Sequence, residues 1–297
     1  MSQTYILLPH GVRTGGPEAL LQLSDALLGS GDSETFVVFF DKGQVALLRE
    51  TPDAEIGAST AISFGTRKME IKEYAHYRLR VAGEIPNTPD SIVVVPEVLA
   101  DLTAHFSRTR VILWWLSVDN AFASLARINL NHLRRENVFH ATQSAYALRM
   151  LEALGLKHAG HLSDYTPERF AGGTPQESRP PCVALNAGIK VVVDLDALEA
   201  RLTAARPDVQ VKRIVKLSRD EVLDTLRRAR VFVDLGNFPG KDRLAREAAL
   251  LGCAVVVADA GAGSTPEDYT LAPEDRVFPW HLDSVAERIL QLLADAD

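Results

Sequence analysis

The chain has 297 residues, of which 46% are hydrophobic and 24% are charged, and its formal net charge is −7. This composition is typical of a globular protein, and the length predicts two ordinary domains. The negative net charge excludes an overall attraction to nucleic acid or to an anionic membrane surface, and only local basic patches would act against it.

Strand-like and helix-like runs alternate over the first 160 residues. Buried strands are predicted from the short apolar runs at 5–9, 34–41, 109–117 and 138–144. Helices are predicted at 17–31 and 145–155, where apolar side chains recur at helical spacing. The stretch 91–106 repeats the pattern as a strand, Pro96 and a helix.

The alternation breaks at 161–181, which is rich in Pro, Gly and polar residues and is predicted to be a linker. The pattern then restarts. Strands are predicted at 182–188, 211–217, 231–236 and 253–259. Helices are predicted at 191–205, 218–229, 242–252 and 283–297. Ser218 and Glu221 have the spacing of a capping box at the start of the second of these helices.

Alternating strands and helices predict parallel sheets with helices on both faces. We therefore expect an α/β protein made of two Rossmann-like, doubly wound domains facing a cleft. The N-terminal domain spans 1–160, the linker 161–181 and the C-terminal domain 182–297, and the last helix either stays in the second domain or packs back on the first. Because open parallel sheets bind ligands beyond the carboxyl ends of their strands, the cleft is the expected site.

Cys182 and Cys253 each lie in an apolar run, which predicts buried, reduced thiols rather than zinc ligands. The N-terminal segment reads as a first strand rather than a signal peptide, and no run approaches the ~20 apolar residues of a membrane span. We therefore expect a cytoplasmic protein, free or peripheral to a membrane, with no cofactor. Neither a dinucleotide-binding Gly-x-Gly-x-x-Gly nor a P-loop lysine motif occurs, which argues against NAD-dependent and ATP-hydrolysing functions.

Three parts of the sequence resemble the GT-B glycosyltransferases of the retaining, family-four (group 1) kind. GGPEALLQLSDAL follows the first strand as Gly-Gly and a helix do in that family. VFHATQSAYALRMLEALGL and HLSDYTPERF resemble its strand-Ser-helix stretch and its interdomain segment. VFVDLGNFPGKDRLAREAALLGCAVVVADAG resembles its donor-binding core. The order and spacing match over most of the chain, which implies a GT-B fold and a nucleotide-sugar substrate.

The family's donor motif is a Glu, seven residues and a second Glu. Glu247 matches the second position, so the resemblance implies that it binds the donor ribose, whereas the first position is occupied by Pro239. Lys190 is the counterpart of a lysine that follows the first C-terminal strand of the family. The resemblance also implies that Lys190, Lys241 and Arg243 bind the donor diphosphate.

The residues themselves also favour an anion site in this segment. A nucleotide sugar leaves a diphosphate behind, and enzymes without a metal stabilise its charge with basic side chains and helix N-termini. Gly240 allows close backbone approach, and Lys241 and Arg243 lie at a helix start, where cations are unfavourable unless an anion binds. The alternative is a solvated turn whose charges pair with Asp242 and Glu247, with Glu247 as a structural cap.

Further candidates follow other predicted strands. Gly261, Gly263 and Ser264 follow the strand at 253–259 and are expected over the donor phosphates. The candidates for the acceptor or sugar side are His10, Gly15, Gly16, Asp119 and Asn120. A tight turn explains the glycine pair equally well, a helix N-cap explains Asp119, and a loop histidine without a role explains His10.

We expect a glycosyltransferase that moves a sugar from a nucleotide-diphosphate sugar to a saccharide or another cell-surface precursor, with retention and without a metal. The spacing Asp-x-Asp at Asp194 and Asp196 lies in a predicted helix rather than at a strand end. No catalytic base or nucleophile is identified, since the leaving phosphate can take the acceptor proton in a front-face mechanism. One alternative, favoured by Pro239, is a non-catalytic GT-B-like subunit that binds a nucleotide, a glycan or a partner protein. A nucleotide-sugar epimerase is the third.

Overall fold

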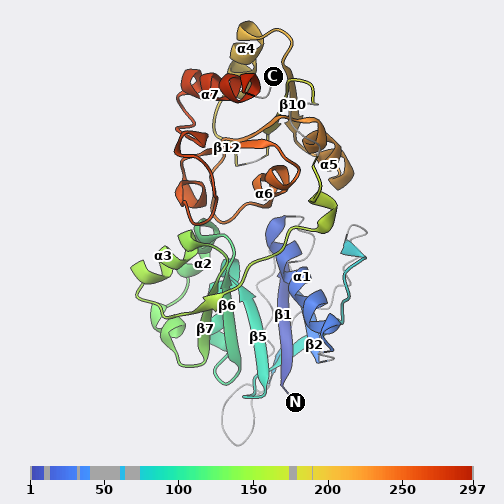
Figure 1. The fold of residues 1–297 in the computed structure, drawn as a ribbon. Helices are drawn as coiled ribbons and strands as arrows, with labels where there is room; N and C mark the ends of the chain where they lie inside the picture. Colours follow the sequence, from blue (N-terminus) through green and yellow to red (C-terminus); the bar gives the residue numbers. More distant parts are fainter. Residues whose placement is uncertain are drawn as a thin grey trace, which may run out of the picture. The chain divides into compact units, whose positions relative to one another are not determined.

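The computed structural model describes residues 2–9, 14–31, 34–40, 61–63, 74–173, 179–188 and 190–295. The candidate residue His10 lies outside this range. The chain forms two compact units, Met1–Tyr165 and Thr166–Asp297, and the change from one to the other falls within 161–181. Figure 1 shows that each unit has its own sheet with helices packed beside it.

Six strands form the sheet of the first unit in the order β2-β1-β5-β6-β7-β8, and all neighbouring pairs run parallel. They are β1 (Gln3–Pro9), β2 (Thr35–Phe40), β5 (Ser91–Pro96), β6 (Arg110–Trp115), β7 (Val138–Thr142) and β8 (His158–His161). A separate antiparallel pair is formed by β3 (Ala61–Ser63) and β4 (Glu84–Pro86).

Helices pack on both faces of this first sheet. On one face α1 (Gly15–Gly29) packs Leu20 and Leu21 into a core with Ile6 and Leu8 of β1. The other face carries η2 (Glu97–His105), η3 (Val118–Ala121), α2 (Phe122–Leu125), η4 (Leu130–Arg134) and α3 (Ala145–Ala153). Figure 1 shows α1 on one side of the strands and α2 and α3 on the other, so side chains that alternate along each strand enter two separate cores.

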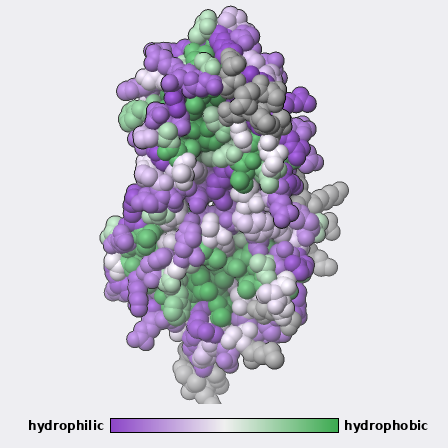
Figure 2. Space-filling model, in the orientation of Figure 1, coloured by the Kyte–Doolittle hydropathy of each residue, from purple (hydrophilic) through white to green (hydrophobic). Residues whose placement is uncertain are grey.

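The helix α1 leaves part of its face of the first sheet uncovered. Ile112 and Phe139 are register partners on this face, and Phe139 is 42% exposed. Figure 2 shows hydrophobic residues gathered over β5 and β6, while hydrophilic residues cover most of the remaining surface in view. The first unit thus presents an apolar area on this face.

Five strands form the sheet of the second unit in the order β10-β9-β11-β12-β13, again with all neighbouring pairs parallel. They are β9 (Cys182–Asn186), β10 (Gln210–Ile214), β11 (Val231–Asp234), β12 (Ala254–Ala258) and β13 (Arg276–Val277). The helical segments are η5 (Glu168–Phe170), α4 (Leu195–Ala205), α5 (Arg219–Arg228), α6 (Arg243–Leu250), η7 (Gly261–Ser264), η8 (Pro273–Asp275) and α7 (Leu282–Ala294).

The last helix is part of the core of the second unit. Val285, Ile289 and Leu293 of α7 pack with Leu198 and Leu202 of α4. The apolar stripe of α7 is therefore used inside the second unit.

The predicted α/β class with two Rossmann-like parallel sheets is confirmed. The sequence missed the edge strands β8 and β13, because β8 alternates between half-buried and exposed residues and β13 has only two residues. The capping box is confirmed: Ser218 Oγ accepts from the Glu221 backbone N–H at 3.3 Å, and Glu221 Oε2 accepts from the Ser218 N–H at 2.7 Å. Of the helices in the described ranges, none has the length and apolar character needed to cross a bilayer.

Both cysteines are buried with free thiols, as the apolar runs around them predict. Burial raises the pKa of the Cys253 thiol to about 11. The Sγ of Cys253 donates to the backbone oxygen of Leu226 at 3.2 Å. A protonated, hydrogen-bonded thiol in a core has little tendency to react, so Cys253 has a packing role.

His140 on β7 is a buried histidine whose neutral form is fixed by its hydrogen bonds. Trp115 Nε1 donates to His140 Nδ1 at 3.1 Å, and His140 Nε2 lies 2.8 Å from the Leu133 carbonyl oxygen. Because Nδ1 accepts, the single ring proton must be on Nε2. Burial lowers the pKa of His140 below 6.5, which keeps the ring neutral.

We predict that His140 makes the first unit acid-sensitive. The pKa of His140 is lower in the folded than in the unfolded chain, so below about 6.5 the unfolded chain binds more protons and stability falls. Denaturant unfolding of the parent and of His140→Gln from pH 7 to pH 5 checks this. The free energy of unfolding should fall more steeply for the parent, and parallel curves would show that His140 is not responsible.

Candidate functional site

The strand order of the second sheet reverses between β9 and β11. At such a position the chain leaves two neighbouring strands toward opposite faces of the sheet, and ligands of open α/β sheets bind in the crevice beyond the carboxyl ends. β9 ends at Asn186 and β11 ends at Asp234. The residues at and after these two ends are therefore the candidates for a ligand site.

Asp234 is a buried carboxylate at this strand reversal. Its Oδ2 accepts a hydrogen bond from Asn186 Nδ2 at 2.7 Å, and its Oδ1 accepts from the backbone N–H of Gly236 at 3.0 Å. Burial and, next, the negative charge of Asp242 raise the pKa of Asp234 to about 6. Asp234 therefore joins the end of β9 to the start of the loop that leads to α6.

Lys190 and Asp242 form an ion pair at the same edge, with Lys190 Nζ 2.9 Å from Asp242 Oδ2. Asp242 is also the N-cap of α6, and its Oδ1 accepts from the Leu244 backbone N–H at 3.0 Å. Burial raises the pKa of Asp242, but the charge and hydrogen bond of Lys190 outweigh burial and hold that pKa below its ordinary value. Since the Lys190 side chain is 41% exposed, this predicted diphosphate ligand is both fixed and accessible.

The start of α6 gives two predicted diphosphate ligands different surroundings. Gly240 is buried and Lys241 is half-buried in the loop before the N-cap. Arg243 is the first residue of α6 and is only 7% exposed. Its Nη2 lies 3.6 Å from Glu247 Oε1. Both cations lie at the helix start, as expected, but Lys241 is partly exposed to solvent whereas Arg243 faces a buried carboxylate.

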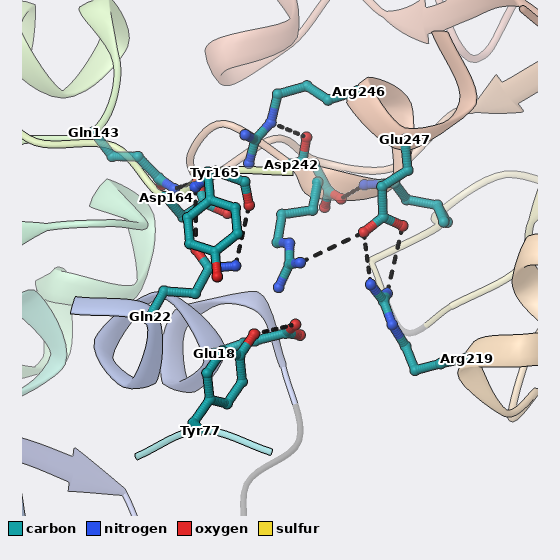
Figure 3. Close-up of polar contacts among 12 residues, drawn as sticks. Glu18, Gln22, Tyr77, Gln143, Asp164, Tyr165, Arg219, Asp242, Arg246 and Glu247 are labelled. Carbon is teal, nitrogen blue, oxygen red and sulfur yellow. Dashed lines mark hydrogen bonds and ion pairs between the residues drawn. The ribbon is translucent and has the colours of Figure 1, made fainter. Parts of the chain in front are cut away.

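Glu247, the predicted ribose ligand, has no exposed surface. Arg219 Nη2 donates to Glu247 Oε1 at 2.7 Å, and Arg219 Nη1 donates to Oε2 at 3.4 Å. Figure 3 shows the Arg219 guanidinium aimed at the two carboxylate oxygens. Glu247 is therefore the anion of an ion-pair cluster rather than an open carboxylate.

Sequence reasoning missed Arg219. It is the first residue of α5, directly after the Ser218 cap, and its guanidinium lies 5.1 Å from the ring centre of Phe170. A cation in the first turn of a helix opposes the helix dipole. The same signal drew attention to Arg243, so it could have identified Arg219 as well.

The residues of η7 have a structural explanation. Gly261 has φ +54°, and a Cβ there would lie 2.1 Å from the carbonyl oxygen of Phe238. A Cβ at Gly263 would lie 2.4 Å from the carbonyl oxygen of Ala258, and Ser264 Oγ donates to the Gly261 oxygen at 2.7 Å. Close backbone packing requires both glycines, and their contact with donor phosphates stays a prediction.

On the first unit, the glycine pair opens α1. Thr14 is the N-cap and its side chain makes no capping hydrogen bond. Gly15 is exposed and Gly16 is half-buried. A Cβ at Gly16 would meet Leu116 Cδ1 at 3.9 Å, an ordinary contact, so packing does not require glycine there. The contact of Gly15 and Gly16 with an acceptor or sugar stays a prediction.

Asp119 follows β6 and is not a helix N-cap, since Ser117 holds that position in η3. Its Oδ1 accepts from the Tyr146 hydroxyl at 2.9 Å. Burial and, next, the hydrogen bond to Asp119 raise the pKa of Tyr146 to about 12. Asp119 is half-buried and oriented by α3, whereas the neighbouring candidate Asn120 is exposed.

Two glutamines that the sequence did not single out hold the end of the first unit. Gln22 Nε2 donates to the Tyr165 carbonyl oxygen and its Oε1 accepts from the Tyr165 N–H, each at 3.1 Å. Gln143 Nε2 donates to Asp164 Oδ1 at 2.6 Å. Figure 3 shows both contacts. They fix the chain where it leaves the first unit.

We predict that Asp242 sets part of the proton affinity of Asp234. Asp242→Asn keeps an oxygen that can cap α6 but removes a negative charge, so the pKa of Asp234 should fall from about 6 while burial still holds it above its ordinary value. A titration of the Asp234 carboxyl carbon by NMR measures this. An unchanged pKa would mean that Asp242 does not influence Asp234.

Comparison with known proteins identifies the fold through solved structures rather than through sequence. No family model matches the sequence, and a search of curated proteins finds no similar sequence. Solved structures do match. Anabaena HepE, in complex with UDP and glucose, has 11% identity and a TM-score of 0.63, covering 100% of this chain and 94% of its own.

Two further structures match at similar levels. Sucrose-phosphate synthase from Thermosynechococcus elongatus has 13% identity and a TM-score of 0.60, covering 99% of this chain and 90% of its own. A putative UDP-N-acetylglucosamine 2-epimerase from Listeria monocytogenes has 12% identity and a TM-score of 0.58, covering 99% and 89%. At such identities the similarity is one of fold, and the chain has the two-domain, Rossmann-like fold of the GT-B glycosyltransferases.

Proposed function

We propose that the chain is a glycosyltransferase that moves a sugar from a nucleotide-diphosphate sugar to a saccharide or another cell-surface precursor, with retention and without a metal. The observation that carries the proposal is the accessible Lys190, fixed by Asp242 at the strand reversal of the second sheet. Support also comes from the fold, which is similar to that of HepE, whose structure was solved with UDP and glucose.

The donor diphosphate is assigned to the carboxyl edge of the second sheet. Lys190 and Lys241 neutralise its charge, Gly240 allows the backbone to approach, and Arg243 adds positive charge from its buried position. As the bond between the sugar and the diphosphate breaks, these cations stabilise the leaving group. The departing phosphate oxygen then takes the acceptor proton, so no side chain is assigned as a base.

The remaining candidates are assigned by their positions at strand ends. Gly261, Gly263 and Ser264 follow β12 at the same edge as Lys190 and are assigned to the donor side. Gly15 and Gly16 follow β1, and Asp119 and Asn120 follow β6, at the carboxyl edge of the first sheet. These four, with His10 from the sequence, are assigned to the acceptor or sugar.

A second candidate function is a non-catalytic subunit that binds a nucleotide. It is favoured by Pro239, which replaces an acidic residue of the family motif, and by the burial of Glu247 on Arg219. Release of nucleoside diphosphate from a panel of UDP-, GDP-, ADP- and TDP-sugars separates the two. Turnover with an acceptor supports the transferase, binding without turnover supports the subunit, and an altered sugar without an acceptor indicates an epimerase.

We predict that Lys190→Ala and Lys241→Ala each weaken nucleoside diphosphate binding. Each removes a charge-assisted contact worth about 1.5–3 kcal/mol, so the dissociation constant should rise roughly tenfold to a hundredfold. Calorimetric titration with UDP, GDP, ADP and TDP measures the change. Lys212→Ala, on the edge strand β10, is the control and should bind like the parent. Equal loss in all three variants would indicate a nonspecific charge effect.

We also predict that activity survives chelation. Asp194 caps α4, so the Asp194–Asp196 spacing does not form a strand-end metal site. The leaving diphosphate is instead assigned to cations of the protein. Donor turnover measured in EDTA and again after dialysis should match the untreated rate. A loss in EDTA that manganese or magnesium restores would contradict metal independence.

A further inference from the structure

Two arginines converge on one buried carboxylate in the second unit. Arg219 and Arg243 are the first residues of α5 and α6, and both lie within ion-pair distance of Glu247 Oε1, at 2.7 Å and 3.6 Å. Each cation opposes the dipole of its own helix. The negative charge of Glu247 offsets the unfavourable interaction of each arginine with its helix dipole. The cluster therefore connects the starts of α5 and α6.

The geometry around Glu247 does not suit a direct ligand to ribose. Its side chain is 0% exposed, and each of its oxygens accepts a hydrogen bond from the same guanidinium. A ribose hydroxyl would have to displace a charge-assisted, two-point contact with a neutral hydrogen bond, which is the weaker interaction. The carboxylate is therefore better suited to hold Arg219 than to meet a substrate.

Arg219 has the properties that Glu247 lacks. Its side chain is 35% exposed, and it follows β10, whose carboxyl end lies at the same edge as those of β9 and β11. A guanidinium has five N–H groups, and the contacts to Glu247 use two of them. Its Nε is buried and has no hydrogen-bond partner among the described residues.

The guanidinium is also fixed in orientation. It lies over the ring of Phe170 at 5.1 Å while Glu247 holds its two terminal nitrogens. An arginine held on two sides loses little freedom when it binds, and its planar fork matches the oxygens of a phosphate. The remaining donors thus form a prepared anion contact.

We propose that Arg219 binds a phosphate oxygen of the nucleoside diphosphate and that Glu247 is a positioning residue that holds Arg219, not a ligand of the ribose. This inference rests on the proposed function, because it takes a nucleoside diphosphate as the ligand. It adds a binding residue to the edge that already carries Lys190 and Lys241, and it assigns Glu247 a different role from the ribose contact that the family resemblance implies.

A double-mutant cycle tests the inference. Arg219→Gln, Glu247→Gln and the double variant are titrated calorimetrically with inorganic pyrophosphate and with UDP, GDP, ADP and TDP. Each single variant should weaken binding of pyrophosphate and of the nucleotides by the same factor, roughly tenfold to a hundredfold. The double variant should bind no more weakly than Arg219→Gln, because the proposal assigns the contribution of Glu247 to phosphate binding to its contact with Arg219. Arg219→Lys should recover part of the affinity.

The control is Arg288→Gln. Arg288 of α7 also makes a close two-point contact with one carboxylate, Asp275, which directly precedes β13 at the opposite edge of the sheet. It should leave pyrophosphate binding unchanged. Thermal melts of all variants identify any that fail to fold, and if Glu247→Gln unfolds, the half-exposed Arg219 variants decide the question alone.

Three outcomes would overturn the inference. Glu247→Gln could weaken nucleotide binding while leaving pyrophosphate binding intact, which would make Glu247 a ribose ligand. Arg219→Gln could bind pyrophosphate as tightly as the parent. The parent could bind neither pyrophosphate nor any nucleotide, which would contradict the proposed function as well as this inference. If the parent binds nucleotides without turnover, only the transferase proposal is contradicted, and the proposal for Arg219 and Glu247 is still tested by the binding data.

Discussion

A carboxylate that leaves water must be given a partner, and this constraint organises the carboxyl edge of the second sheet. Asp234 accepts from Asn186, Asp242 pairs with Lys190, and Glu247 pairs with Arg219. Each pair joins two segments distant in sequence. Together they hold the ends of β9 and β11 and the starts of α5 and α6 in one arrangement, so the same contacts that satisfy buried acids also place cations at the edge where a ligand would bind.

The charge concentrated at 241–247 follows from this arrangement. Asp242 caps α6 and Glu247 is enclosed one turn later, while Lys241 stays half-buried in the loop. The two carboxylates are therefore engaged in contacts within the protein, whereas the ammonium group of Lys241 remains partly accessible. A surface ion-pair network would instead leave both the acidic and the basic side chains exposed to water. The fold alone does not decide the activity, because the structures that it matches include sucrose-phosphate synthase and a putative epimerase.

The sequence predicted what depends on local patterns. The apolar runs located the long strands, and the Ser218–Glu221 spacing located the start of α5. It missed β8 and β13, which are short edge strands without an apolar run. The position of Arg219 at a helix start is a local signal, but its contact with Glu247 joins residues 28 positions apart, which no local pattern records. Glu247 was found as a candidate, but its complete burial depends on the packing of two helices.

The most direct test of the account is hydrogen–deuterium exchange with and without a saturating nucleoside diphosphate, using UDP, GDP, ADP and TDP in turn. We predict slower exchange at 186–188, 190, 215–219 and 235–247 with at least one nucleotide, because these residues form the proposed donor edge. Segments at the opposite edge, such as 206–209 and 273–275, should be unaffected. No change with any nucleotide, or protection confined to the opposite edge, would contradict a donor site at the carboxyl edge of the second sheet.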